Sequence, residues 1–488
     1  MAERFPEHIA LALDPSTRRS ADGRSLLGGS PLRLLRFSEA GARAVDRVLQ
    51  GGEIPASGPD AVVARRLLDA GIAHPRPTGA PDVHLCVVVP VRDHTAELAD
   101  LLDHLGDLPA GAAVVVVDDG STDPAAVRAV AGGRATVLRH EQALGPGPAR
   151  DAGWRAVDGD VVAFLDADVV PAPGWLEPLL AHLRDPAVGL VAPRVRSRPG
   201  RSLLARYERH RSPLDLGGRE ARVVPRGRVS YVPTAALVVR REVLDALGGF
   251  DASMRVGEDV DLVWRAIEAG WTVRYEPAAE VVHRPRRSWA ALLRQRAAYG
   301  SAAAPLDRRH PGAVAPVELN AWSLAAWALV ALGGPVGAIA GVGVAAGTSL
   351  ALAPKLRGRM DRPTRTAVAL AGGGTLHAGT WLGRSVWRAW LPVALAGSVA
   401  SRRVRRATLA AAVVPALVDR RAATRSGEPV DVDPVRWTLA HAADDAAYCA
   451  GIWRGAIRCR SARALLPRLS GIPGLTGRAE SGPGRAGR

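Results

Sequence analysis

Cysteines are scarce in this sequence, and its first residues are not typical of a secretory signal. The three cysteines, Cys86, Cys449 and Cys459, match no zinc-binding spacing. Cys86 lies inside an apolar run typical of a buried strand, so we expect no disulfides, which suits a cytosolic active site. The first residues, MAERFPEH, lack the apolar core of a signal peptide, and any membrane attachment is expected from the C-terminal half.

Lysine is almost absent, because Lys355 is the only one, yet the formal net charge is +16. Arginine-rich chains often bind phosphate backbones, which makes a nucleic-acid partner worth testing. The arginines here instead flank apolar runs and accompany no recognised nucleic-acid-binding motif. We therefore expect no nucleic-acid partner.

Acidic residues follow three apolar runs that are short and rich in β-branched residues. The runs are 83–90 (VHLCVVVP), 113–117 (AVVVV) and 161–165 (VVAFL), with a helical pattern at 97–105. Asp93 follows the first run, Asp118 and Asp119 the second, and Asp166 and Asp168 the third. Open α/β sheets bind ligands at the carboxyl ends of their strands, so this placement predicts a site.

The Asp166-Ala-Asp168 pair suggests a metal. Hard carboxylate oxygens favour Mg²⁺ or Mn²⁺, and these ions commonly keep several water ligands and coordinate substrate phosphates. A nucleoside diphosphate completes such a site better than a closed protein cage. An isolated Asp-x-Asp is more often a solvated turn, so the interpretation depends on the ordered set of motifs around it.

This ordered set resembles the family-2 glycosyltransferases over about residues 83 to 300. The resemblance rests on VVVPVRD (87–93), VVDDGSTD (116–123), GPGPARDAGW (145–154), FLDADVVP (164–171), GGFD (248–251) and GEDVDLVWR (257–265). It implies a GT-A fold, a nucleotide-sugar donor that is usually a UDP-sugar, and inversion at the anomeric carbon.

The resemblance also assigns roles to residues of this chain. Asp93 and Asp119 match positions that hold uracil and ribose, and Arg150 matches an arginine beside the diphosphate. Asp166 and Asp168 match the metal motif, to which a histidine such as His283 can contribute. The predicted donor-binding set is Asp93, Asp118, Asp119, Arg150, Asp166 and Glu258.

Asp259 matches the catalytic base. The stretch 260–267 (VDLVWRAI) is amphipathic, so Glu258 and Asp259 are expected at a helix N-terminus, where backbone N–H groups favour anions. An acceptor hydroxyl must lose a proton as it attacks, and a carboxylate within reach can take it, a contribution of roughly 10²–10⁴-fold. An ordinary N-cap is the alternative role for Asp259.

Residues beyond the common core point to the acceptor. Arg294, Gln295, Arg296 and Tyr299 resemble imperfectly the Gln-x-x-Arg-Trp element that holds the product in processive members, but the tryptophan is missing and the spacing differs. Segments 13–41 and 299–312 resemble a branch of the family that adds β-linked glucose to a redox cofactor made from a ribosomal peptide. The acceptor would then be a peptide-derived small molecule, and other enzymes of that cofactor pathway would be partners.

Residues 1–82 predict a small winged-helix-like module. A strand at 32–37 (LRLLRF) precedes a helix capped by Ser38 and a second amphipathic helix at 60–70. Such modules can bind peptides by adding a strand to a sheet edge. A structural cap on the catalytic domain is the alternative, and the sequence leaves both open.

The C-terminal half predicts membrane association. Residues 319–354 carry no formal charge over 36 positions, more than the roughly 20 apolar residues that span a bilayer. This segment could cross once or form a hairpin. Further uncharged runs cover 366–383, 389–401 and 407–418, and one to three membrane segments are expected. Between Lys355 and Arg425 there are 14 basic and two acidic residues, which favours a cytoplasmic side and a cell-membrane location for the enzyme.

The predicted fold class is α/β, with a Rossmann-like mixed sheet of GT-A type, a winged-helix-like N-terminal module and a helical, partly membrane-embedded C-terminal region. The predicted regions are 1–82 (recognition or cap module), 83–312 (catalytic domain), 313–425 (membrane-associated helices), 426–470 (helical tail) and 471–488 (disordered tail).

Other functions remain possible. A dehydrogenase is disfavoured because 145–149 (GPGPA) has prolines where a dinucleotide loop needs N–H groups. A non-catalytic scaffold that binds a nucleotide or peptide is disfavoured, because it would give the ordered set of acidic residues no role. Within enzymes, a transferase acting on a polyprenyl phosphate and a polysaccharide synthase are the rivals.

Overall fold

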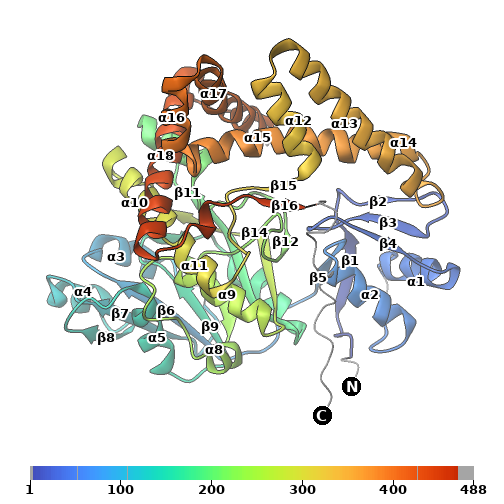
Figure 1. The fold of residues 1–488 in the computed structure, drawn as a ribbon. Coiled ribbons are helices and arrows are strands. Elements are labelled where there is room, and N and C mark those ends of the chain that lie inside the picture. Colours follow the sequence, from blue (N-terminus) through green and yellow to red (C-terminus); the bar gives the residue numbers. More distant parts are fainter. Residues whose placement is uncertain (1–3, 52, 107, 426, 471–488) are drawn as a thin grey trace. The chain divides into compact units, whose positions relative to one another are not determined.

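The computed structural model describes residues 4–51, 53–106, 108–425 and 427–470 of the chain (Figure 1). The fold divides into two compact units, residues 1–288 and 289–488. The predicted tail at 471–488 lies outside the described residues. The helices at 289–301 and 303–309, which the predicted regions assign to the catalytic domain, belong to the second unit. The division into five regions stays a prediction.

A nine-stranded mixed sheet forms the centre of the first unit. Its order is β10-β14-β11-β13-β9-β6-β7-β8, with β12 beside β14. Strands β6, β7, β8 and β9 are parallel, whereas β13 pairs with β9 and β11 in antiparallel fashion. The strands are β6 (Leu85–Val91), β7 (Ala113–Asp119), β8 (Thr136–His140), β9 (Val161–Leu165), β10 (Val169–Pro171), β11 (Val188–Ser197), β12 (Ala221–Val223), β13 (Ala236–Arg240) and β14 (Thr272–His283).

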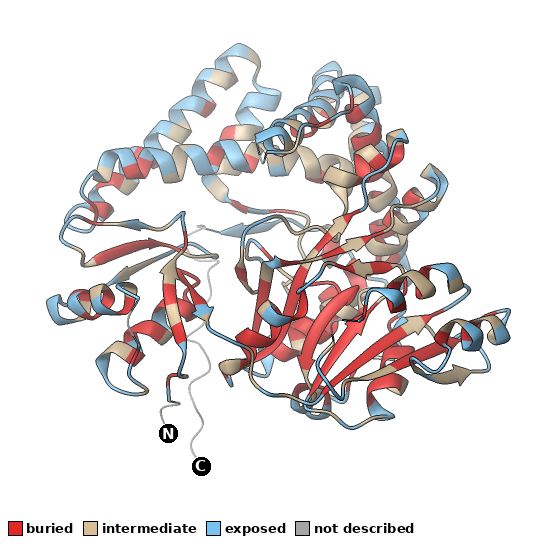
Figure 2. Ribbon diagram, turned by 180° about the vertical axis from the view of Figure 1, so that it is seen from behind, coloured by how far each residue is buried: buried red, intermediate tan, exposed pale blue. Residues whose placement is uncertain are grey.

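The predicted strands and the predicted fold class are confirmed. The three apolar runs form β6, β7 and β9, because buried parallel strands are apolar on both faces. Figure 2 shows the sheet as the most buried part of this unit. The helices that follow its strands include α3 (Thr95–Asp103), α4 (Pro124–Ala131), α5 (Pro146–Arg155), α6 (Leu176–Ala181), α7 (Leu203–Arg211), α8 (Arg241–Leu247) and α9 (Glu258–Glu268). A mixed sheet of this kind with helices around it is the GT-A architecture.

The N-terminal part of this unit has a core of its own. It contains β1 (Ile9–Leu13) paired with β5 (Ala73–Pro77), and a sheet of β2 (Arg18–Arg19), β3 (Ser25–Gly28) and β4 (Arg33–Arg36). Helices α1 (Glu39–Leu49) and α2 (Pro59–Asp69) form where they were predicted, and the Ser38 side chain accepts a hydrogen bond from the Gly41 N–H. Leu26, Val45 and Leu67 are fully buried in the shared core. The likeness to a winged helix stays a prediction.

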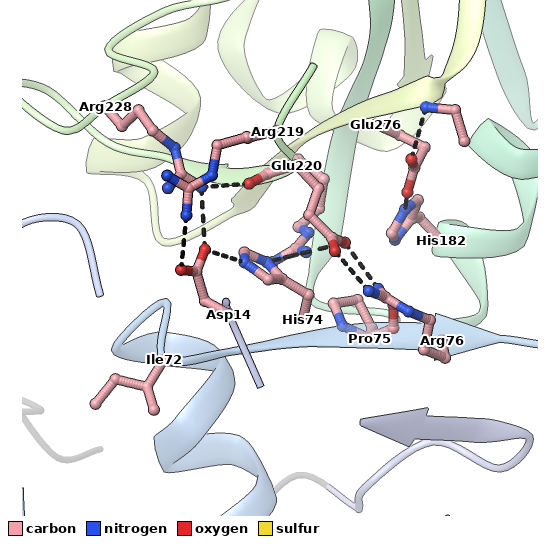
Figure 3. Close-up of polar contacts among 12 residues, drawn as sticks. Asp14, Ile72, His74, Pro75, Arg76, His182, Arg219, Glu220, Arg228 and Glu276 are labelled. Carbon is pink, nitrogen blue, oxygen red and sulfur yellow. Dashed lines mark hydrogen bonds and ion pairs between the residues drawn. The ribbon is translucent and has the colours of Figure 1, made fainter. Parts of the chain in front are cut away.

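Buried charges join this N-terminal part to the catalytic sheet (Figure 3). Asp14 accepts hydrogen bonds from Arg219 and Arg228, both at 3.2 Å, and lies 2.9 Å from Nε2 of His74. The other imidazole nitrogen of His74 lies 3.2 Å from Nη2 of Arg274 on β14. A second bridge joins Arg76 of β5 to Glu220 at 2.5 and 2.8 Å. The N-terminal part is therefore fixed to the sheet by specific ion pairs.

The second unit is mainly helical. Its elements are α10 (Trp289–Ser301), α11 (Ala303–Arg309), β15 (Glu318–Asn320), α12 (Ala321–Leu332), α13 (Gly334–Leu356), α14 (Pro363–Ala367), a π-helical turn (Val368–Gly372), α15 (Gly373–Arg388), α16 (Leu391–Ala400), α17 (Arg402–Arg425), α18 (Pro434–Arg458), a 3₁₀ turn (Arg463–Leu465) and β16 (Arg468–Ser470). Strands β15 and β16 pair in parallel.

The uncharged 36-residue run folds back on itself. Gly333 separates α12 from α13, Gly334 begins α13 at φ +64°, and glycines of α13 let the two helices pack closely. A Cβ on Gly337 would lie 2.2 Å from the Leu329 carbonyl oxygen, and one on Gly341 would lie 2.6 Å from that of Ala326. Helices α12 and α13 therefore form a helical hairpin, and how this segment meets a membrane stays a prediction. Among the described residues, only α13 is long and apolar enough to cross a membrane.

Candidate active site

The acidic motifs meet at one edge of the central sheet. Strands β7, β6 and β9 lie side by side and parallel, so their carboxyl ends share an edge. Asp93 follows β6, Asp118 and Asp119 end β7, and Asp166 follows β9. The strand order thus brings together motifs that are up to 73 positions apart in the sequence.

Asp93 is held in an unusual backbone conformation, with φ +59°. Its N–H donates to Ser121 Oγ at 3.0 Å, and its carboxylate accepts from the Thr122 N–H at 2.7 Å and from the Thr122 hydroxyl. These hydrogen bonds from Thr122 hold the pKa of Asp93 below its ordinary value. The loops after β6 and β7 are therefore tied together around an ionised carboxylate.

Asp118 and Asp119 organise the loops after β7 and β8. Asp118 is buried, accepts from the Ser121 N–H at 2.9 Å and pairs with Arg139. Asp119 accepts from the N–H groups of Leu144 and Gly145 at 2.9 and 2.8 Å and lies 2.9 Å from Nδ1 of His140. Both Asp119 oxygens are thus engaged in shaping the segment before α5. Their predicted contact with the nucleotide stays a prediction.

Arg150 of α5 lies between two of the other predicted site residues. Its Nη2 donates to Asp166 at 2.6 Å and its Nη1 donates to Glu258 at 3.1 Å. The side chain is only 4% exposed, and the guanidinium carbon lies 5.7 Å from the centre of the Phe250 ring. Nε of Arg150 has no hydrogen-bond partner among the described residues. The arginine assigned to the diphosphate therefore also joins the metal motif to the start of α9.

Glu258 and Asp259 open α9, as the sequence predicts. Burial and the neighbouring Asp259 raise the pKa of Glu258 to about 7, although Arg150 opposes the shift. Burial also raises the pKa of Asp259, against the hydrogen bond that its Oδ1 accepts from the Val260 N–H at 2.8 Å. A carboxyl group with a raised pKa in a buried site is a better proton acceptor than an exposed aspartate.

Asp168 and His283, both predicted metal ligands, are in contact with each other. Antiparallel pairing of β10 with β14 sets Val169 opposite His283, so His283 Nε2 lies 3.1 Å from Asp168 Oδ2. Burial opposes ionisation of Asp168, but the contact with His283 outweighs it and lowers the pKa. The two side chains come from strands more than 110 positions apart.

This pair fits a divalent ion only in part. Among the described residues, no group of three or more His, Cys, Asp or Glu side chains is arranged to hold a metal. Asp168 and His283 supply an oxygen and a nitrogen side by side, while the near oxygen of Asp166 is bound to Arg150. Mg²⁺ and Mn²⁺ keep several waters and use substrate phosphates, so two protein ligands suit a site that the donor completes.

Asp151 makes a structural contact near the site that the sequence did not predict. Its Oδ1 accepts from the Phe250 N–H at 3.1 Å and from Trp154 Nε1 at 2.8 Å. Gly249, at φ +80°, lets the GGFD segment approach this carboxylate, since a Cβ there would lie 2.3 Å from Oδ1. The GPGPARDAGW motif contains Asp151, but its spacing gave no signal of this contact.

The four residues predicted on the acceptor side all lie on α10 of the second unit. Gln295 Nε2 donates to the Tyr299 hydroxyl at 2.9 Å. Arg296 is buried and donates to Asp444 of α18 at 2.7 Å. Arg294 is exposed, and the contact of these four residues with the acceptor stays a prediction.

The family is shown by comparison with known proteins. Residues 86–248 match the model of the family described as "Glycosyl transferase family 2". With the relative described next, this match shows that the chain belongs to glycosyl transferase family 2. The predicted family is confirmed, and the chain is a transferase.

A relative of nearly full length lies within the predicted branch. The chain is similar to the Pre-mycofactocin glycosyltransferase of Mycobacterium tuberculosis, with 41% identity over 96% of this chain and 99% of the relative. It is also 35% identical, over 29% of this chain and 52% of the relative, to the N-acetylglucosaminyl-diphospho-decaprenol L-rhamnosyltransferase of that organism.

A solved structure resembles the fold more loosely. The mannosyltransferase PcManGT from Pyrobaculum calidifontis, in complex with GDP-Man and Mn²⁺, has 23% identity and a TM-score of 0.38, covering 61% of this chain and 86% of that chain.

Proposed function

We propose that this enzyme transfers glucose from UDP-glucose to a hydroxyl group of pre-mycofactocin, with inversion, and repeats the step to build a short β-linked chain. The observation that carries the proposal is the relative called Pre-mycofactocin glycosyltransferase, which aligns with almost the whole chain, including segments outside the catalytic core. Segments 13–41 and 299–312 lie outside residues 86–248, which match the family model.

The donor would lie over the carboxyl ends of β6, β7 and β9. Asp93, Asp118 and Asp119 hold the loops there, and Asp93 has the most accessible of the three carboxylates, at 46% side-chain exposure. The uracil and ribose would contact this group. Asp168 and His283 would hold Mg²⁺ or Mn²⁺, with Asp166 beside them, and the bound ion would offset negative charge on the leaving diphosphate.

Asp259 would take the proton of the acceptor hydroxyl. It lies at the N-terminus of α9 with one oxygen fixed by the Val260 N–H, which leaves the other oxygen to accept the proton. A base on the face opposite the diphosphate allows direct displacement, in which the new carbon–oxygen bond forms as the sugar–phosphate bond breaks. Such a displacement inverts the anomeric centre and gives a β-glycoside from an α-linked donor.

The enzyme is also proposed to sit at the cell membrane with its catalytic unit facing the cytoplasm, where UDP-sugars are made. The support is the length and composition of α13 and the excess of arginine between residues 355 and 425. Other enzymes of the same cofactor pathway would supply the peptide-derived acceptor.

A polyprenyl phosphate acceptor is the second candidate. It is favoured by the exposed apolar side chains of α12, α13, α16 and α17, which a lipid-linked substrate would approach closely. The rhamnosyltransferase relative, whose name gives a diphospho-decaprenol substrate, covers only 29% of this chain.

Incubation of the purified protein with labelled UDP-glucose and two acceptor pools separates these functions. One pool is the small-molecule fraction of cells that lack the protein, and the other is a polyprenyl phosphate in detergent. We expect label in the small-molecule pool, with a mass gain of one or more hexoses. Label found only in the lipid extract would favour the second candidate, and absence of turnover with every nucleotide sugar would favour a non-catalytic scaffold.

A further inference from the structure

The helices α12 to α17 of the second unit expose an unusual amount of apolar surface. Large hydrophobic side chains that are more than one-third exposed cluster here, and Figure 2 colours much of these helices as exposed. On α13 the exposed positions include Val336 at 77% and Ile339 at 75%, and on α16 Val399 reaches 88%. A soluble surface rarely carries so many in one region, and such patches commonly mark an interaction surface.

Most of these helices are too short to cross a bilayer. Helix α12 has 12 residues and α16 has 10, which at 1.5 Å per residue is about 18 and 15 Å against a hydrocarbon core of about 30 Å. Helix α17 has 24 residues, but its uncharged part, 407–418, is also only about 18 Å long.

Positively charged side chains lie at both ends of the α12–α13 hairpin. Arg403 of α17 donates to the Leu332 carbonyl oxygen at 2.9 Å, at the tip of the α12–α13 hairpin. The opposite end of α13 carries Lys355 and Arg357. If the hairpin stood upright, Arg403 would lie about 18 Å from the start of α12, deep in hydrocarbon, where an arginine is costly.

The inner face of α17 is built for protein contact. Asp419 pairs with Arg384 of α15 and lies 3.1 Å from Nε2 of His441 on α18. The opposite face of α17 exposes Leu409, Val413 and Leu417, with Arg402, Arg405 and Arg406 exposed at its start. Helix α17 thus has one face that packs on ionised side chains and one apolar face flanked by arginines. This pattern is typical of a helix that lies in the membrane interface.

We propose that the second unit docks on a single leaflet of an anionic bilayer, with α12, α13, α16 and α17 in the plane of the interface and no helix crossing. The arginines at the start of α17 contact lipid phosphates, and Trp322 and Trp381, both exposed, suit the same interface. This inference rests on the proposed membrane location and replaces the single span that the length of α13 permits.

Vesicle flotation of the full-length protein tests the lipid partner. We expect binding to phosphatidylcholine vesicles that contain phosphatidylglycerol and at least tenfold weaker binding to phosphatidylcholine alone. Arg402→Gln/Arg405→Gln/Arg406→Gln should weaken binding to the anionic vesicles on the order of a hundredfold, at about fivefold per arginine. The matched control, with exposed Arg18, Arg36 and Arg128 of the first unit changed to Gln, should bind like the wild type. Equal binding to both vesicles, or equal loss in both variants, overturns the proposal.

Cysteine labelling of cells tests the in-plane arrangement. Leu332→Cys at the hairpin tip and Arg359→Cys beyond α13 are each placed in a Cys459→Ser background, since Cys86 and Cys449 are buried. An impermeant maleimide should label both positions in inverted membrane vesicles and neither in intact spheroplasts. Labelling of either position from outside shows a crossing helix, and protection of Leu332→Cys on both sides shows an inserted hairpin. Both outcomes overturn the proposal.

Sugar transfer measured in detergent keeps the two proposals separate. A variant that loses vesicle binding but keeps transfer supports the docking role of the arginines. If the wild type binds vesicles as expected but transfers no sugar, the proposed function fails while the docking surface stands.

Discussion

Arg150 and Glu258 are 108 positions apart in the sequence and are joined by a buried hydrogen bond of 3.1 Å. The same guanidinium holds Asp166 at 2.6 Å, so one side chain connects the Asp-x-Asp segment to the helix that presents Asp259. An arginine can do this because its planar fork offers donors in two directions, whereas the ammonium of lysine is a single point charge.

Arg150→Lys should therefore lower kcat by 10- to 100-fold with a smaller change in the KM for the donor. Arg150→Ala should also unfold more readily, because removing one partner of a buried ion pair typically costs about 3–5 kcal/mol. Steady-state kinetics and thermal unfolding of both variants test this. A lysine variant with full kcat would show that the bridge has no part in the reaction.

Asp259→Asn should lower kcat at least 10²-fold, because the acceptor proton then has no carboxylate to receive it. The affinity for UDP should stay nearly unchanged. Turnover and calorimetric UDP binding are the two measurements. Asp261→Asn on the same helix is unsuitable as a control, since Asp261 is buried and pairs with Arg265, so the exposed Glu268→Gln is the better match. Loss of UDP binding in Asp259→Asn would assign this residue to the donor instead.

The pH dependence of kcat should have its acidic limb above the ordinary range of aspartate. Burial raises the pKa of Asp259, and that of the adjoining Glu258 is raised to about 7. The base works when ionised, so activity should fall as the pH is lowered, and the fall should begin above the ordinary aspartate pKa of about 3.9. A profile that stays flat down to pH 4.5 would contradict a buried carboxylate base.

Asp168→Ala should abolish metal-dependent UDP affinity, and a chelator should have the same effect on the wild type. His283→Ala should weaken it less, because an oxygen ligand suits Mg²⁺ or Mn²⁺ better than a nitrogen. UDP binding measured with and without EDTA and added Mn²⁺ reports on this directly. If chelation leaves both binding and turnover unchanged, the metal assignment is wrong.

The local parts of this site could be predicted from the sequence, and the contacts between distant segments could not. Apolar runs that end in aspartate predict β6, β7 and β9 because a buried parallel strand leaves its signature in a few consecutive residues. The Arg150 bridge and the Asp151–Phe250 hydrogen bond depend on how α5 meets segments about 100 positions away. The engagement of Asp119 with the N–H groups of Leu144 and Gly145 likewise carries no sequence signal, since any residue but proline supplies an N–H.

The contact between Asp14 and His74 should make the stability of the first unit depend on pH. Burial lowers the pKa of His74, and the Arg274 guanidinium lowers it further, so the imidazole is neutral at pH 7. A neutral His74 can donate from Nε2 to Asp14 while Nδ1 accepts from Arg274, which satisfies both neighbours. Burial opposes ionisation of Asp14, but hydrogen bonds from His74 and Ser16 outweigh it and hold its pKa well below the ordinary value.

Both groups therefore bind protons more readily when the chain is unfolded. The contribution of His74 should be complete above its unfolded pKa of about 6.5 and be lost as the pH falls below that value. The contribution of Asp14 should persist until the pH falls below about 3.9. His74→Gln keeps one donor and one acceptor without titrating, so it should unfold like the wild type at pH 7.5 and be the more stable protein at pH 5.5. Thermal unfolding of both at the two pH values tests this, and an equal decrease in both would place the pH dependence elsewhere.

The same contacts decide how the N-terminal part can be tested as a peptide-binding module. Deletion of residues 1–75 would remove Asp14 and His74 and leave Arg228 and Arg274 without these partners against the sheet, so we expect the truncated chain to misfold.

A single substitution on the outer edge of β4 tests peptide binding without removing these contacts. The Phe37 N–H donates to Arg24, and because hydrogen bonding alternates along an antiparallel pair, the Leu34 N–H faces away from β3. Leu34→Pro should leave the fold intact and, if the acceptor adds a strand at this edge, raise its KM at least tenfold without changing the KM for the donor. An unchanged acceptor KM in this folded variant would identify residues 1–82 as a structural cap on the catalytic domain.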